Sequence, residues 1–140
     1  MPAINELKRE LDSIDFVYSE QELNGAETLI IYFPLEEFNI SVGVGIFIRE
    51  EKNIYDVFFM NLLQGDLESG KKSRILEICN EFNIQSDYEK MYIQENNSLV
   101  IRHAGSLDGF NARWLLGNIF HTIDRLNNYY LAQIFGVRWS

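Results

Sequence analysis

The chain has 140 residues, of which 46% are hydrophobic and 14% aromatic, so it is long enough to bury one core and too apolar for a disordered protein. Its 21 acidic and 12 basic side chains give a net charge of −9, which argues against a nucleic-acid backbone or an anionic membrane surface as a partner. We expect one α+β domain over residues 1–140.

Cysteine content and hydropathy indicate the compartment. The single cysteine, Cys79, cannot form an intramolecular disulfide and fits a reducing, cytoplasmic environment. The charged first ten residues lack the apolar segment of a signal peptide, and no apolar run approaches the length of about 18 residues that spans a bilayer. We therefore expect no membrane partner.

Three elements are predicted before residue 34. Apolar residues at steps of three and four predict a helix over about residues 3–13. A short strand is expected at 16–18, before a turn at 21–25 that contains an Asn-Gly pair. Residues 27–33 are β-branched and aromatic and predict a strand that ends at Pro34, because proline has no N–H group for a ladder.

The next two strands are predicted from alternation. Residues 40–48 place Val42, Val44, Ile46 and Ile48 on one face and Ser41, Gly43, Gly45 and Phe47 on the other. Glycine inside a strand indicates a bulge or the close approach of a helix or a partner chain. Residues 54–63 are apolar on both faces, so a helix or a second copy of the chain has to cover each face.

The second half of the chain predicts a helix, a hairpin and a long helix. A polar break at 65–70 precedes a helix with the stripe Ile75, Leu76, Cys79 and Phe82, which Asn83 closes in the left-handed conformation. Strands at 87–94 and 98–103 form a hairpin in which Met91 and Ile93 oppose Leu99 and Ile101. The last helix is capped by Asp108 or Ser106, runs to Gly136 and carries the stripe Leu116, Ile119, Ile123, Leu126, Tyr130 and Ile134.

Catalytic and metal-binding patterns are not found in the sequence. Cys79 lies on an apolar stripe and is interpreted as a core residue, while His103 and His121 lie on separate elements without metal-ligand spacing. We interpret both histidines as structural or surface residues. We predict no catalytic residue, no cofactor and no metal, and thus a protein that is not an enzyme.

The positive signal is an interaction surface. A possible interface comprises Gly43, Gly45, Phe47, Tyr129 and Tyr130, although aromatic residues at such positions are equally often part of a core. Charge is uneven, because residues 1–68 hold 14 acidic and 4 basic side chains whereas residues 69–140 hold 7 and 8. A basic partner is expected to dock on the acidic half.

The segment 78–83, the following hairpin and residues 106–135 resemble the YbjN family of proposed bacterial sensory-transduction regulators. That resemblance implies the fold of type III secretion chaperones, with an antiparallel sheet, three helices and the element order α-β(3-4)-α-β-β-α. It also implies a small, acidic, cytoplasmic homodimer that holds an extended or partly folded protein segment on an apolar surface. It implies no site residue.

Three functions are hypotheses at this point. The first is a non-enzymatic protein-interaction module, chaperone-like or regulatory, that forms a homodimer and binds a partner segment which is basic or partly unfolded. The second is an acidic immunity-type protein that neutralises a basic toxin, and the third is a small enzyme or small-ligand binder of unknown chemistry.

Overall fold

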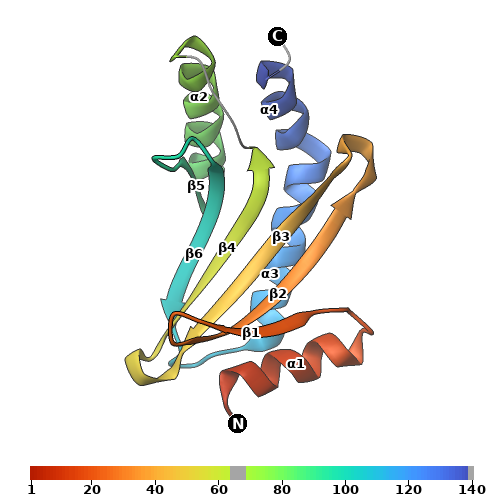
Figure 1. The fold of residues 1–140 in the computed structure, drawn as a ribbon, viewed down its shortest axis with the longest axis vertical. Coiled ribbons are helices and arrows are strands. Elements are labelled where there is room, and N and C mark those ends of the chain that lie inside the picture. Colours follow the sequence, from red (N-terminus) through yellow and green to blue (C-terminus); the bar gives the residue numbers. More distant parts are fainter. Residues whose placement is uncertain (64–68, 139–140) are drawn as a thin grey trace.

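The protein folds as a six-stranded antiparallel sheet in the order β1-β2-β3-β4-β6-β5, with helices packed on one face (Figure 1). It is described by a computed structural model that defines residues 1–63 and 69–138. The strands are β1 (Ser19–Leu23), β2 (Ala26–Leu35), β3 (Ile40–Arg49), β4 (Ile54–Leu63), β5 (Lys90–Ile93) and β6 (Leu99–Ser106). The helices are α1 (Ala3–Ser13), α2 (Ser69–Gln85), α3 (Ala112–Arg125) and α4 (Leu131–Arg138).

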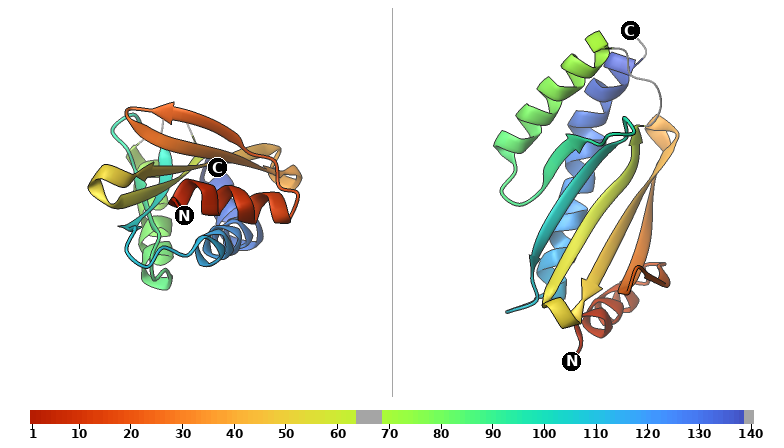
Figure 2. Two further views of the ribbon diagram at one scale, coloured as in Figure 1. Left: turned by 90° about the horizontal axis from the view of Figure 1, so that it is seen from below. Right: turned by 60° about the vertical axis from the view of Figure 1, so that its left-hand side comes forward.

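A π-helical segment, η3 (Leu126–Tyr130), joins α3 to α4, so that the three form one long rod behind the sheet (Figure 1). The views from below and from the side place α2 and this rod on the same side of the sheet (Figure 2). In the described part of the chain no helix lies on the opposite side, which we call the open face. When α3, η3 and α4 are counted as one continuous helix, the expected α+β class with three helices is confirmed.

Strand β3 shows the predicted alternation. Val42, Val44, Ile46 and Ile48 are all buried on the helix side. The expected bulge at the glycines is wrong, because Gly43 pairs with Met60 and Gly45 with Phe58 in an unbroken register. The irregularity instead lies in β4 between Phe59 and Leu63, where Asn61 has a φ angle of 68°.

The turn between β2 and β3 and the turn between β3 and β4 have the same structure. Each has two glutamates in a short 3-10 turn, η1 (Glu36–Phe38) after β2 and η2 (Glu50–Lys52) after β3. Each turn is followed by an asparagine in the left-handed region, Asn39 at φ 52° and Asn53 at φ 58°. Asparagine adopts this region more readily than other residues that carry a side chain, so the repeated Glu-Glu-x-Asn motif fixes both turns.

The first hairpin corrects two sequence predictions. The strand expected at 16–18 lies instead at 19–23, and the turn consists of Asn24 and Gly25 alone, with φ angles of 52° and 77°. All five residues of β1 are exposed, so this strand carries no apolar alternation that the sequence could reveal.

Strand β2 also runs through Pro34 to residue 35. Counting along the ladder from the hairpin, Ile30, Tyr32 and Pro34 direct their backbone groups away from β3. Pairing with β1 stops at Ile30, so the N–H group that proline lacks would have pointed away from any ladder partner.

Helix α2 begins at Ser69, so Gly70 lies inside it, and residues 65–68 of the predicted polar break fall outside the described chain. Its buried residues are Ile75, Ile78, Cys79 and Phe82, while Leu76 is 44% exposed, contrary to the predicted stripe. Asn83 does not end the helix. Its side-chain amide instead holds Met91 of β5, accepting from the backbone N–H at 2.7 Å and donating to the carbonyl at 3.1 Å.

The hairpin of β5 and β6 has the predicted register, with Met91 opposite Ile101 and Ile93 opposite Leu99, although β5 begins at Lys90 rather than at 87. The predicted stripe of the last helix is confirmed, since all six residues are buried. The cap is Asn111, whose Oδ1 accepts from the Trp114 N–H at 3.0 Å, and not Asp108 or Ser106. The last helix also continues past Gly136.

Helix α1 closes one end of the sheet and is fixed by residues remote in sequence. The Glu50 carboxylate accepts from the Ala3 N–H at 3.3 Å. The Glu6 carboxylate of α1 accepts a hydrogen bond from the Ala112 N–H at 3.1 Å. Because Ala112 is the first residue of α3, this bond ties α1 to the beginning of α3. Glu10 of α1 also pairs with Arg113 of α3 at 3.4 Å.

Candidate functional site

The open face has an apolar centre built around two glycines. A Cβ atom on Gly45 would lie 2.8 Å from the Phe47 ring and 3.4 Å from Met60 Cε, and one on Gly43 would lie 3.4 Å from the Tyr32 ring. These side chains therefore fold over the space that the glycines leave. The Phe58 ring packs edge-on against Phe47 at 5.7 Å. The space at the glycines is thus filled by Phe47 of the same strand and by Tyr32 and Met60 of the neighbouring strands, and no helix of the described chain approaches it.

Charges on the open face are balanced at its centre, and the turns at the two ends of β3 each contain two glutamates. Arg102 on β6 stacks over the Phe58 ring at 5.4 Å and donates from Nε to Asp56 Oδ1 at 3.0 Å. The acidic turns η1 and η2 lie at the two ends of β3 (Figure 1). An apolar centre with an acidic turn at each end is the result.

The five predicted interface residues do not form one surface. Gly43, Gly45 and Phe47 lie together on the open face, whereas Tyr129 and Tyr130 lie in η3 on the helix side. Tyr130 is 4% exposed and packs edge-on against Phe82, so it belongs to the core. Tyr129 is half-exposed and donates to Glu81 of α2 at 2.9 Å.

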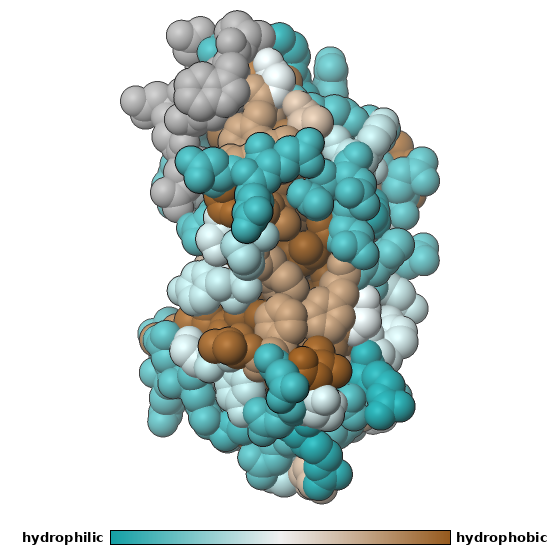
Figure 3. Space-filling view, turned by 90° about the vertical axis from the view of Figure 1, so that its right-hand side faces the viewer, coloured by the Kyte–Doolittle hydropathy of each residue, from teal (hydrophilic) through white to brown (hydrophobic). Residues whose placement is uncertain are grey.

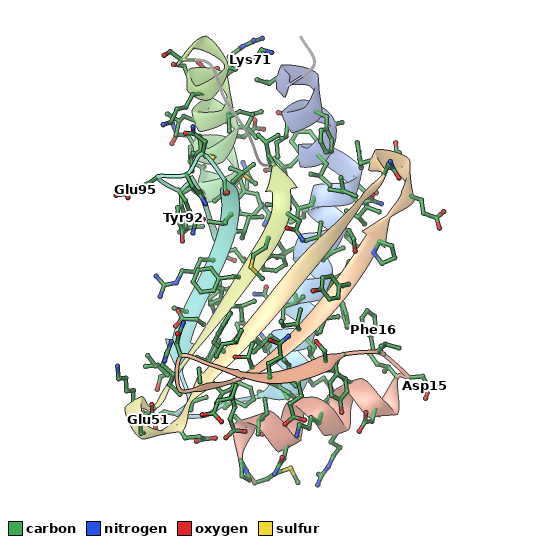
Figure 4. The ribbon with its side chains drawn as sticks, in the orientation of Figure 1. Asp15, Phe16, Glu51, Lys71, Tyr92 and Glu95 are labelled. Atoms are coloured by element: carbon green, nitrogen blue, oxygen red, sulfur yellow. The ribbon has the colours of Figure 1, made fainter. Side chains whose placement is uncertain are left out.

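A second apolar surface lies where the helices meet the β2 side of the sheet; we call it the seam. The rings of Phe16, Phe33 and Phe120 contact one another with centroids 5.3–5.8 Å apart, and Phe38 stacks on Phe135 at 5.5 Å. Phe16 lies at this side of the molecule (Figure 4), and a space-filling view of the same side shows an apolar band along most of its length (Figure 3). The seam is thus largely filled by phenylalanine side chains.

The sequence did not reveal a buried polar cluster that joins α3 to the loop before β5. Glu89 is 3% exposed and accepts hydrogen bonds from Ser86 Oγ at 3.2 Å, from Thr122 Oγ1 at 3.1 Å and from Asn118 Nδ2. Arg125 lies over the Phe82 ring at 4.4 Å and donates to the same serine at 3.1 Å. Each of these residue types is ordinary in isolation, and only the fold brings them together.

His103 lies next to this cluster and is 5% exposed, so it is a structural histidine of the interior. Its Nε2 is 3.2 Å from the hydroxyl of Tyr55. Burial lowers the pKa of His103, with Glu89 acting weakly in the opposite direction, and burial also raises the pKa of Tyr55, assisted by Glu89 and Tyr88. Both shifts favour the uncharged forms, as is expected of side chains packed in the interior.

Other reactive groups offer no catalytic arrangement. Cys79 is buried, and burial raises the pKa of its thiol to about 11, which disfavours the nucleophilic thiolate. His121 is exposed on α3. Within residues 1–63 and 69–138, no three His, Cys, Asp or Glu side chains are grouped as metal ligands, and no helix is long and apolar enough to cross a membrane.

The architecture defines an α+β class in which one antiparallel sheet carries its helices on a single face, and two solved structures share it. YbjN from E. coli, a proposed transcription regulator, has a TM-score of 0.57 at 17% identity, over 94% of this chain and 90% of YbjN. An uncharacterised protein from Methanothermobacter thermautotrophicus has a TM-score of 0.62 at 15% identity, over 99% of this chain and 95% of the other. No family model and no curated protein matches the chain. The fold is YbjN-like, as the sequence resemblance predicted.

Proposed function

We propose that this protein is a non-enzymatic interaction module, chaperone-like or regulatory, which binds an extended basic segment of a partner protein on the open face. The observation that carries the proposal is the apolar centre around Gly43 and Gly45, which no helix of the described chain covers. Tyr32 at this centre is 56% exposed, and Phe47, Phe58 and Met60 are partly exposed. Exposed apolar patches of this kind mark interaction sites.

The shape and charge of the open face favour an extended chain. The side chains lie over glycines rather than around a cavity, so the surface is shallow and suits alternate side chains of a strand-like segment. Glutamates in the turns at the two ends of β3, Glu36 and Glu37 in one and Glu51 in the other, attract basic residues that flank an apolar stretch. Apolar contact supplies affinity, and the two turns supply orientation.

The proposal includes a cytoplasmic homodimer in which a second copy covers the seam. Ile14 is 52% exposed and Val17 is 85% exposed, and Figure 3 shows an apolar band on this side of the molecule, which is the kind of surface that an interface covers. Light scattering at several protein concentrations measures the oligomeric state. We expect a dimer that Val17→Asp shifts toward monomer, whereas a strict monomer at all concentrations contradicts this part of the proposal.

Suppression of aggregation tests the open face. Reduced, unfolding lysozyme serves as a basic client and reduced α-lactalbumin as an acidic one, with turbidity as the readout. We expect the protein to suppress aggregation of lysozyme more strongly, and Met60→Asp on the open face to weaken that effect. Leu76→Asp is the matched control, since Leu76 is an exposed apolar residue of α2 on the other side. Equal activity of both variants contradicts the assignment to the open face.

An immunity-type protein for a basic toxin gives a different result in the same system. It would bind one folded basic partner with strong salt dependence and would not suppress aggregation of unfolding lysozyme through the open face. Met60→Asp would then have no effect, because surface charge rather than the apolar centre carries such binding. That outcome overturns the interaction-module proposal in favour of the second function.

A further inference from the structure

A pocket lies where β6 ends and α3 begins. Its volume is about 310 Å³, at the lower end of the range for small-ligand sites. It is separate from the open face, so a ligand can bind in it whether or not the proposed function holds. Its lining includes Tyr55 of β4, Asp108 and Phe110 of the loop, and Asn111 and Trp114 at the start of α3.

The loop that forms one wall is held in place before any ligand binds. Asn53 Nδ2 donates to Asp108 Oδ1 at 2.9 Å, and the Asp108 N–H donates to Ser106 Oγ at 3.0 Å. The Leu107 N–H donates to the Asn53 carbonyl at 3.0 Å. These bonds tie the loop to the turn between β3 and β4, so the pocket is preformed.

Three aromatic side chains from three different elements line the pocket. The rings of Tyr55 and Phe110 contact edge to face at 5.7 Å, and Trp114 is 43% exposed. Trp114 is supported from behind by Tyr88 at 5.0 Å and His103 at 5.9 Å. Aromatic faces attract cations through the ring quadrupole, and tryptophan does so most strongly.

The charges around the pocket favour a cation over an anion. A helix N-terminus ordinarily favours an anion, but at α3 the Ala112 N–H already donates to the Glu6 carboxylate and the Trp114 N–H to Asn111 Oδ1. Asp108 adds a carboxylate at the pocket itself. Two N–H groups at the start of α3 that could hold an anion are therefore already used, and the Asp108 carboxylate in the pocket lining repels one.

We propose that this pocket binds an organic cation, a quaternary ammonium or guanidinium group, between the rings of Tyr55, Phe110 and Trp114 and next to the Asp108 carboxylate. The group belongs either to a free small molecule or to a basic side chain of a partner protein. Both sources present the same chemistry to the site.

The test is a titration of the ¹⁵N-labelled protein, following the amides of Gly109, Asn111 and Trp114. Choline is the probe, and 3,3-dimethylbutan-1-ol is its uncharged isostere. We expect saturable shifts with choline and binding of the isostere weaker by about tenfold, the scale of a cation–π contact. N-acetyl-arginine amide, titrated in parallel, represents a partner's side chain, and tighter binding of either cation identifies the source.

Two variants locate the site. Asp108→Asn retains an oxygen that can accept from Asn53 and is expected to weaken choline binding severalfold, while Trp114→Leu is expected to abolish it. Tyr129→Leu is the control, because Tyr129 is similarly exposed but lies in η3, about four helical turns away from Trp114 along the rod. Thermal unfolding of each variant separates loss of binding from loss of the fold.

Three results overturn the proposal. Equal binding of choline and its isostere shows an apolar pocket, stronger saturable shifts with inorganic phosphate show an anion site, and unchanged spectra at tens of millimolar choline show no site.

Discussion

Replacement of Glu89 by alanine is expected to destabilise the fold by about 3 kcal/mol, because it leaves polar groups buried without their acceptor. Ser86, Asn118 and Thr122 all donate to this carboxylate. Hydrogen bonds to a charged group are worth about 1.5–3 kcal/mol each, but the two hydroxyl groups can rotate toward other acceptors. The amide of Asn118 has less freedom, so the net loss is about that of one or two such bonds.

Urea unfolding at pH 7, followed by circular dichroism, measures this loss as a shift of the midpoint at constant slope. Glu89→Gln keeps the shape and one acceptor oxygen and should cost about half as much. Glu95→Ala is the matched control, since Glu95 is exposed in the turn of the neighbouring hairpin (Figure 4), and should change stability by less than about 0.5 kcal/mol. A loss below about 0.5 kcal/mol for Glu89→Ala refutes a structural role for the cluster.

The remaining predictions concern His103, two glycines and Cys79. Burial lowers the pKa of His103, so the unfolded chain binds a proton at this histidine more tightly than the folded chain does. The free energy of unfolding should therefore fall as the pH drops below about 6.5, by at most about 1.4 kcal/mol per pH unit. His103→Asn should flatten this slope between pH 6.5 and 5, and equal slopes for this variant and the parent protein contradict the assignment. Gly105→Ala should cost about 1–3 kcal/mol in urea unfolding, since a Cβ there would lie 2.6 Å from the buried hydroxyl that bonds His103. Gly117→Ala, with nothing within 4 Å, should stabilise α3 by about 0.5–1 kcal/mol, and the same sign for both glycines contradicts the packing argument. Thiol labelling of Cys79 at pH 8 should be about 100-fold slower in the folded protein than in urea, and rapid labelling of the folded protein contradicts its burial.

Sequence patterns correctly predicted the strands and helices that bury one face. The alternation of β3 and the stripe of the last helix follow from one buried face, so apolar spacing alone locates them. The Met91–Ile101 register follows likewise from a turn flanked by alternating residues. These features depend on residues close in sequence.

The errors arise where contacts between distant residues decide the structure. Strand β1 is exposed throughout and is held by pairing with β2, so no apolar pattern marks it. Asparagine often ends a helix in the left-handed backbone conformation, which is why Asn83 was expected to end α2. Its side-chain amide instead accepts a hydrogen bond from Met91 of β5, and the helix continues past it. Part of the site was predictable, since Gly43, Gly45 and Phe47 share a face, whereas Glu89 gave no signal because its partners on α3 lie about thirty residues away.

The position of α1 has a consequence for the order in which the chain folds. Its Glu6 accepts from Ala112, a contact that spans 106 residues, and Phe16 just after the helix packs against Phe120. During synthesis α1 therefore emerges long before α3, and until α3 is complete its apolar stripe can pack only against the sheet. A chain stalled before residue 112 would expose Leu7 and Leu11, residues that are fully buried in the finished fold.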